Sequence, residues 1–159
     1  AYRTDYDLKA HGQDYHDQET GEKFVPHVIE PSLGVERTAL AVLLSAYSEE
    51  KDHVVLKLSP KLAPYKVAVF PLLANRPELV KLARTIYDEL KPHFMTAWDD
   101  RGNIGKRYYA QDEIGTPFCA TIDFDSLEDK KVTVRDRDSM KQERINISEL
   151  ANHLKKKLE

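Results

Sequence analysis

Hydrophobic positions in the first third of the chain predict a short strand and a helix behind a polar segment. The first two dozen residues show neither a helical nor an alternating hydrophobic period, which is typical of a loop or hairpin. The apolar run 24–30 predicts a strand, and the turn residues 31–34 precede a helix. Helical spacing predicts one buried face on this helix, formed by Leu40, Leu43, Leu44 and Tyr47.

The rest of the chain alternates between strand and helix patterns. Pro60 and Pro64 bracket a linker, so we place a domain boundary between residues 59 and 60. Five segments have the composition and hydrophobic pattern of strands, and the last two of them predict a hairpin: 66–73, 94–98, 118–124, 131–137 and 142–147. Periodic leucines predict a helix between the first and second strands, with Asn75 and Glu78 as a capping box, and a final helix with Ser148 as N-cap.

A third helix is predicted through Lys106, Tyr109 and Glu113, closed by Gly115. The order of elements from residue 60 is therefore βαβαβββα. Because residues 67–73 are all apolar, we expect the segment 66–73 to form a strand that is covered on both faces. The predicted fold class is α/β, with a mixed, mostly parallel five-stranded sheet flanked by three helices.

Charge and composition narrow the function classes. The formal net charge of −3 argues against binding nucleic acid through bulk charge, but residues 130–144 hold six basic and three acidic residues. Composition alone leaves open whether this window binds RNA or is a solvated strand and turn. No segment has the length of a membrane helix, and the start lacks the apolar core of a secretory signal. The single cysteine, Cys119, excludes an internal disulfide and favours a reducing, cytosolic compartment.

The segment VIEPSLGVERTAL, residues 28–40, carries the most specific chemistry. It places the carboxylate of Glu30 at a strand end, a turn of small residues next, and Arg37 in the first turn of a helix. A helix start with a guanidinium suits a phosphate, and a carboxylate suits an ammonium group. Together they would fit an amino acid beside a nucleotide. Taken alone, residues such as Glu30 and Arg37 more often form a structural ion pair or are exposed charges than form a binding site.

This segment resembles motif 3 of class II aminoacyl-tRNA synthetases, in the form found in glycyl-tRNA synthetases. The resemblance implies that Arg37 contacts the phosphates of ATP and that Glu30 and Ser32 line the glycine pocket. It further implies that residues 1–59 are a strand-helix remnant of the antiparallel catalytic domain. Class II motifs 1 and 2 do not occur in this sequence. We therefore expect no catalytic residue and no glycine activation in this polypeptide alone, which would be a carboxy-terminal fragment of the ligase.

Three further blocks resemble the anticodon-binding domain of the same synthetases. They are LAPYKVAVFPL, GNIGKRYYAQDEIGTPFCATIDFD and VTVRDRDSMKQERI. The resemblance implies that residues 60–159 bind the anticodon stem-loop of glycine tRNA. The parent enzyme, by the same resemblance, is a cytoplasmic homodimer that attaches glycine to tRNA through a glycyl-adenylate made from ATP with Mg²⁺. No tightly bound cofactor is expected in the fragment.

Cations and polar groups within these blocks are the candidate contacts to tRNA. Phosphates are held by cations, and unstacked loop bases are read on their edges or stacked on planar side chains. The candidate residues are Lys106, Arg107, Arg135, Arg137, Lys141 and Arg144. Helical spacing separates the faces of Lys106, Arg107 and Tyr108, so at least one of them is expected to pack inward.

Other chemistry is weakly supported. Gly102 and Gly105 lack the Gly-Lys-Ser/Thr of a phosphate-binding loop, and the histidines show no metal-ligand spacing. We predict no metal site, because Asp123 and Asp125 follow a strand and suit turn N–H groups. The alternative function is a non-catalytic nucleic-acid-binding accessory protein with the same domain. A small α/β enzyme with its own active site is a third possibility, but no nucleophile-base arrangement supports it.

Overall fold

The computed structural model describes residues 2–3, 12, 14–25 and 29–158. The chain divides into two compact units, residues 1–41 and 42–159. In the first unit, β2 (Tyr15–His16) and β3 (Lys23–Phe24) form an antiparallel hairpin, as the polar start of the chain allowed. β1 (Tyr2–Arg3) pairs antiparallel with β4 (Ile29–Glu30). The ends of the predicted strand 24–30 lie in β3 and β4, and residues 26–28 lie outside the described residues.

Helix α2 (Val35–Ala46) begins directly after Gly34, as predicted. Its predicted buried face is wrong, because Leu40, Leu43 and Leu44 are between 48% and 67% exposed. Tyr47, the fourth member, is also exposed and begins β5. The buried residue of this helix is Ala46, which lies in a small cluster with Leu58 and Ala63. Helical periodicity therefore identified an apolar stripe on α2 correctly, but the prediction that this stripe is buried was wrong.

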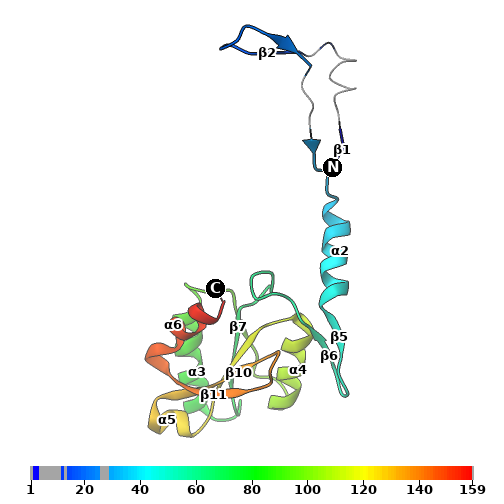
Figure 1. Ribbon diagram of the computed structural model, residues 1–159. Coiled ribbons are helices and arrows are strands. Elements are labelled where there is room, and N and C mark those ends of the chain that lie inside the picture. Colours follow the sequence, from blue (N-terminus) through cyan, green and yellow to red (C-terminus); the bar gives the residue numbers. More distant parts are fainter. Residues whose placement is uncertain (1, 4–11, 13, 26–28, 159) are drawn as a thin grey trace. The chain divides into compact units, whose positions relative to one another are not determined.

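A five-stranded mixed sheet forms the centre of the second unit (Figure 1). The strands are β7 (Val67–Pro71), β8 (Thr96–Trp98), β9 (Phe118–Ile122), β10 (Lys131–Asp136) and β11 (Gln142–Asn146). Their order across the sheet is β11-β10-β9-β7-β8. β7 is parallel to both of its neighbours, β9 and β8, whereas β9–β10 and β10–β11 are antiparallel. The predicted α/β fold with a mixed five-stranded sheet is confirmed.

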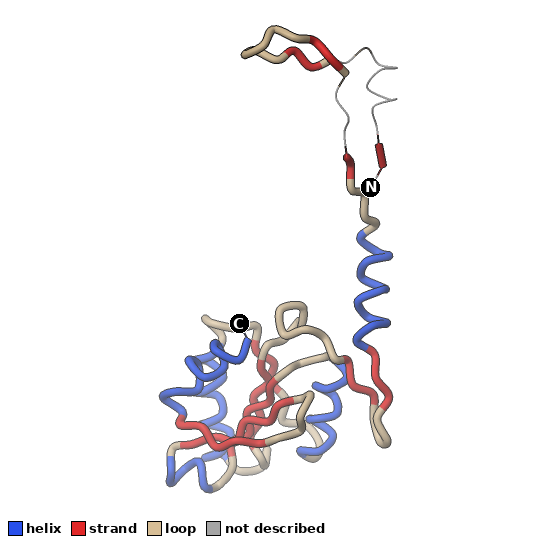
Figure 2. The backbone as a smooth tube through the Cα atoms, in the orientation of Figure 1, coloured by secondary structure: helices blue, strands red, loops and turns tan. Residues whose placement is uncertain are grey.

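Helices cover both faces of this sheet (Figure 2). α3 (Pro77–Leu90) and α6 (Ile147–Leu158) pack on one face, and α4 (Ile104–Ile114) packs on the other. The side chains of β7 alternate between the two layers, so Val69 contacts the α3 side and Phe70 the α4 side. Burial of each large apolar side chain contributes roughly 1.5–3 kcal/mol. This double burial explains why the segment carries no polar alternation.

Local signals at helix ends held in part. Gly115 ends α4 at a φ of 86°, as predicted. Asn103, which was not predicted as a cap, accepts a hydrogen bond from the Lys106 N–H at 2.9 Å at the start of the same helix. The predicted capping box of α3 is wrong, because the N-cap is Arg76, whose side chain makes no capping bond. Ser148 is not an N-cap either, since α6 starts at Ile147. Proline at the first position of α3 provides a start that needs no side-chain cap.

A short helix, α5 (Asp125–Asp129), follows β9 and was not predicted. Five residues are too few to show a hydrophobic period. The turn is held instead by Asp123, whose Oδ1 accepts hydrogen bonds from the Ser126 N–H at 2.9 Å and the Ser126 hydroxyl at 2.8 Å. Asp123 therefore satisfies turn N–H groups, as expected for an aspartate after a strand.

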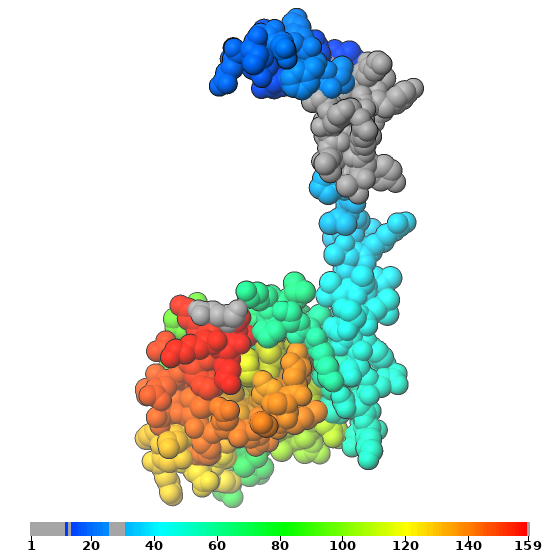
Figure 3. Space-filling view, in the orientation of Figure 1, coloured from blue at the N-terminus to red at the C-terminus, as the bar shows by residue number. Residues whose placement is uncertain are grey.

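A hairpin precedes the sheet and belongs to the same unit. It consists of β5 (Tyr47–Glu49) and β6 (Val54–Leu56), and β6 lies against α4. Figure 3 shows these residues in contact with the body of the second unit. Residues 42–59 thus belong to the same compact unit as the sheet, and the domain boundary between residues 59 and 60 stays a prediction. In the described part of the chain, no helix combines the length and the apolar character needed to cross a membrane.

Candidate nucleic-acid interface

The sheet topology marks one end of the second unit as the place for a ligand. The connection from β7 through α3 to β8 runs over one face, and the connection from β8 through α4 to β9 runs over the other. Strand order therefore reverses between β7 and β9. Open α/β sheets bind ligands beyond the carboxyl ends of such strands. In this chain those ends are Pro71 and Ile122, with the loop 99–103 beside them.

Arg107 organises this end of the sheet. Its side chain is 2% exposed and donates hydrogen bonds to backbone carbonyl oxygens of four residues: Pro71, Asp100, Arg101 and Gly102. The loop before α4 is consequently held against the end of β7. Lys106, the neighbouring residue in the first turn of α4, is exposed. An exposed cation near a helix start suits a phosphate group.

The sheet face beside α4 combines a small apolar cluster around Phe70 with polar groups. The hydroxyls of Tyr108 on α4 and Thr121 on β9 are 2.6 Å apart, and Thr121 is paired with Thr133 of β10. Burial raises the pKa of Tyr108 and outweighs the opposing hydrogen bond with Thr121. The guanidinium of Arg135 lies 4.8 Å from the centre of the Tyr108 ring. This face therefore presents hydroxyls and a planar side chain.

Arg144 of β11 joins this face to the loop after β9. It donates hydrogen bonds to Asp123 Oδ2 at 2.7 Å and to Asp129 Oδ2 at 2.8 Å, and its side chain is 31% exposed. The hydrogen bond from Arg144 lowers the pKa of Asp129. Partial burial raises the pKa of Asp123, but hydrogen bonds from Ser126 and the charge of Arg144 lower it overall. Arg144 thus stabilises the loop and keeps part of its guanidinium in solvent.

A buried carboxylate connects three segments on the other side of α4. Asp112 is completely buried and accepts two hydrogen bonds from the Arg135 guanidinium, each at 2.9 Å. His53 of the β5–β6 hairpin approaches the same carboxylate through Nε2 at 3.1 Å and stacks on Tyr109 at 4.0 Å. Burial lowers the pKa of Arg135, but the Asp112 carboxylate outweighs this and raises it overall.

Arg137 forms a second link to the hairpin. Its Nη2 donates to the Leu58 carbonyl oxygen at 2.9 Å and its Nη1 to the Gly115 carbonyl oxygen at 2.7 Å. The side chain is 2% exposed, and Asp138 supplies the neighbouring carboxylate at 2.8 Å. Arg137 therefore holds the segment after β6 against the end of α4.

Comparison with known proteins identifies this sheet unit. Residues 66–157 match the family model described as "Anticodon binding domain". The chain belongs to that family. Over 99% of its length it is 53% identical to a glycine–tRNA ligase of Geobacillus thermodenitrificans. It is also 53% identical over its whole length to that of Clostridium beijerinckii, and 50% identical over 99% to that of Thermobifida fusca.

The similar ligases are longer than this chain, which spans 36–37% of their length. A crystal structure of prolyl-tRNA synthetase from Cryptosporidium parvum, complexed with halofuginone and AMPPNP, matches with a TM-score of 0.73. It covers 94% of this chain and 31% of that one at 24% identity, so this likeness shows the fold alone. The resemblance to class II synthetases that the motifs indicated is confirmed.

The anticodon-binding domain exposes only some of the predicted tRNA contacts. Lys106, Lys141 and Arg144 are exposed. Arg107 and Arg137 are 2% exposed and Arg135 is 5% exposed, and intramolecular acceptors engage each of these guanidiniums. Their placement argues against direct contact with RNA and for a role in holding the domain together. Sequence spacing indicated that one of the residues 106–108 packs inward, and Arg107 is the most buried of them.

The predicted glycine and ATP residues lie outside the anticodon-binding domain. Glu30 ends β4, where its backbone is paired with Tyr2. Ser32 is exposed in the turn that follows, and Arg37 is exposed in the first turn of α2. Their roles stay predictions.

Sequence reasoning missed Asp112, the carboxylate partner of Arg135, and His53, which contacts Asp112. Asp112 and His53 are 59 positions apart, and no local pattern predicts that they meet. The only local signal was a charged residue at an inward position of α4, next to Gln111. Among the described residues there is no group of three or more His, Cys, Asp or Glu side chains that could hold a metal ion.

Proposed function

We propose that this chain is part of a glycine–tRNA ligase and that its anticodon-binding domain holds the anticodon stem-loop of glycine tRNA. The observation that carries the proposal is identity of 50–54% to glycine–tRNA ligases over 99–100% of the chain, across both units. The match of residues 66–157 to the family described as "Anticodon binding domain" supports RNA as the partner. Single-stranded loop bases are accessible to side chains, so direct readout of the anticodon is physically reasonable.

The contact surface in this proposal is the sheet face beside α4 together with the first turn of α4. Lys106 and Arg144 neutralise phosphates there, whereas Lys141 of the β10–β11 turn contacts the RNA from the α6 side of the sheet. Arg107, Arg135 and Arg137 support the surface from within, because their donors are engaged by carbonyl and carboxylate oxygens. Tyr108 and the hydroxyl of Thr133, which are both partly exposed, offer a planar group and a hydrogen-bonding partner for bases, and the buried Thr121 hydroxyl orients Tyr108.

Binding of tRNA tests the proposal directly. A filter-binding assay would compare a glycine tRNA transcript with a transcript whose anticodon bases are replaced. We expect tighter binding of the unchanged transcript. Equal affinity for the two would argue against anticodon readout.

A charge-matched pair of variants tests the surface. Lys106→Met should reduce the slope of log affinity against log salt concentration by about 0.7–0.9, the effect of losing one phosphate contact. Lys81→Met removes an equally exposed cation from α3, on the opposite face of the sheet, and should leave the slope unchanged. Equal changes in slope for the two variants would show that the α4 side is not the contact surface.

The whole enzyme, in this proposal, is a cytoplasmic homodimer that attaches glycine to tRNA through a glycyl-adenylate formed from ATP with Mg²⁺. Glu30 and Ser32 line the glycine site, and Arg37 contacts the ATP phosphates. In the full-length ligase, Arg37→Met should raise the KM for ATP in glycine-dependent pyrophosphate exchange. An unchanged KM would remove Arg37 from the ATP site.

We propose further that the 159-residue polypeptide alone does not activate glycine. The residues it contributes are one edge of a substrate pocket, and class II motifs 1 and 2 do not occur in it. Glycine-dependent pyrophosphate exchange by the purified polypeptide should stay at background. Exchange above background would overturn this part of the proposal and leave the RNA-binding part standing.

A further inference from the structure

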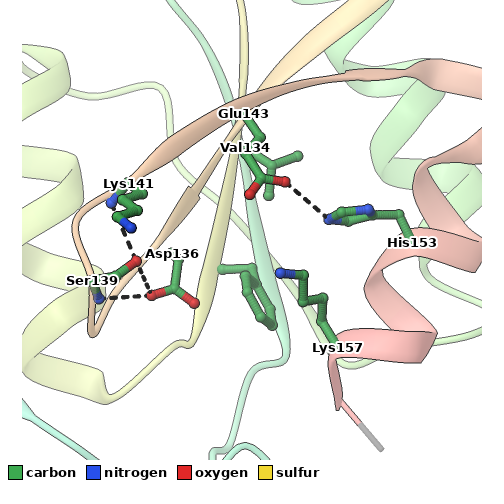
Figure 4. Close-up of a pocket in the computed structure, with 8 residues that line it drawn as sticks. Val134, Asp136, Ser139, Lys141, Glu143, His153 and Lys157 are labelled. Atoms are coloured by element: carbon green, nitrogen blue, oxygen red, sulfur yellow. Dashed lines mark hydrogen bonds and ion pairs between the residues drawn. The ribbon is translucent and has the colours of Figure 1, made fainter.

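A polar pocket lies on the opposite side of the sheet from the proposed RNA surface. It is a cavity of about 250 Å³ between the β10–β11 hairpin and α6 (Figure 4). Val134 of β10 forms part of its floor and belongs to the apolar core that α6 covers, which places the pocket on the α6 face. Eight residues line it: Phe118, Val134, Asp136, Ser139, Lys141, Glu143, His153 and Lys157.

The charges around this pocket balance. Asp136 and Glu143 contribute two carboxylates, and Lys141 and Lys157 contribute two ammonium groups. None of the ion pairs found among the described residues involves either lysine. His153 Nε2 lies 4.0 Å from Glu143 Oε2, which is beyond hydrogen-bond distance. These donors and acceptors are therefore available to a ligand.

One acceptor in the pocket is already oriented. Asp136 Oδ1 accepts hydrogen bonds from the N–H and the hydroxyl of Ser139, both at 2.7 Å. These bonds fix the carboxylate at the hairpin turn and leave Oδ2 free of them. Figure 4 shows His153 and Lys157 projecting from α6 toward the two carboxylates. The hairpin and the helix thus supply acceptors and donors that face each other.

This combination selects a neutral ligand that has both donors and acceptors. A simple anion would meet two carboxylates, and a simple cation would meet two ammonium groups. The floor adds the edge of an aromatic ring, Phe118, and an aliphatic side chain, Val134. A nucleobase is planar and neutral, and proteins read unstacked RNA bases through hydrogen bonds to their edges.

We propose that this pocket binds an unstacked RNA base that carries an exocyclic amine, such as cytosine. The amine donates to the carboxylates of Asp136 and Glu143, and Lys141 and Lys157 donate to the ring nitrogen and carbonyl oxygen. This inference rests on the proposed RNA partner and adds a second contact, on the α6 face of the anticodon-binding domain. The helix dipole accounts for cations at the end of α6 in general. It does not account for the pocket, because Lys155 and Lys156 lie at the same helix end and only Lys157 lines the pocket.

Nucleoside titrations followed by NMR test the pocket. The probes are cytidine, uridine and inorganic phosphate, each added to the complete 159-residue chain, and the reporters are the His153 ring and the Ser139 amide. We expect cytidine to shift both reporters in a saturable way and uridine to bind more weakly, since it lacks the exocyclic amine. Equal shifts with uridine, or shifts with phosphate alone, would overturn the assignment, as would no shift with cytidine.

Matched variants separate the pocket from general charge. Lys157→Met should weaken cytidine binding by about tenfold, as expected for a lost hydrogen bond to a charged group. Lys156→Met removes the same charge one residue away, outside the pocket, and should leave binding unchanged. Glu143→Gln should abolish the preference for cytidine over uridine, whereas Glu149→Gln should retain it. If Lys157→Met and Glu143→Gln bind cytidine like the parent chain, the pocket proposal fails. The tRNA filter-binding result decides the proposed function separately.

Discussion

Replacing Asp112 by asparagine removes the one negative charge that faces the buried guanidinium of Arg135. Asp112 is completely buried, the Arg135 side chain is 6% exposed, and three hydrogen bonds meet at the carboxylate. Removing one partner of a buried ion pair costs about 3–5 kcal/mol, because the other charge remains desolvated without compensation. Since whole domains are stable by only about 5–15 kcal/mol, Asp112→Asn should remove a large fraction of the free energy of unfolding.

Urea unfolding at pH 7 measures this loss. Trp98 is the only tryptophan of the chain and lies in β8, so its fluorescence reports the sheet unit. The control is Lys57→Met, which breaks an ion pair to Glu50 with both side chains at least 40% exposed and should cost at most about 1 kcal/mol. Asp112→Leu combined with Arg135→Met should recover most of the stability, because apolar residues can replace a buried pair. A loss below about 1 kcal/mol for Asp112→Asn would refute this account of the network.

Three other measurements test separate features of the structure. Gly115→Ala should destabilise the chain more than Gly102→Ala in urea unfolding, because both glycines have a positive φ but only at Gly115 would a Cβ approach a carbonyl oxygen to 2.9 Å; equal losses would contradict this. The pKa of Asp129 is lowered by Arg144, so this pair stabilises the fold above about pH 4, the unfolded-state value, and the contribution disappears as the pH falls through the lower folded-state pKa. Arg144→Met should therefore lose less stability than the parent chain between pH 5 and acidic pH, and an identical pH profile would remove the pair as the cause. Burial raises the pKa of Cys119, which is 1% exposed, so a disulfide reagent should modify it only after unfolding; rapid modification of the native chain would contradict this burial.

Local patterns predicted the sheet unit well because its strands and helices differ in period and composition. The run 67–73 has no polar position, and the structure buries the alternate side chains of β7 under α3 and α4. Gly115 marked the end of α4 because a left-handed residue acts within one turn. Such features depend on residues that are neighbours in the sequence, so they can be predicted from the sequence alone.

Long-range partners decided what local patterns left open. Arg135 and Arg137 had the composition of RNA contacts, yet both are buried because Asp112 and the Leu58 carbonyl oxygen, 79 positions from Arg137, engage them. The apolar stripe of α2 was wrong in the opposite direction: it was predicted to be buried and is exposed. Periodicity indicates that a helix face is apolar but does not indicate what covers it.

The sequence by itself determined the family, the order of the five sheet strands and of the three long helices beside them, and the segment that carries the candidate glycine and ATP residues, because these follow from local composition, period and motif. Only the tertiary structure decided which cations stay in solvent, that the β5–β6 hairpin is attached to the sheet unit, and that a charge-balanced pocket forms beneath the β10–β11 hairpin. Each of these depends on groups that are distant in sequence and adjacent in space, and the free energy of burying or exposing a charge is set by those neighbours.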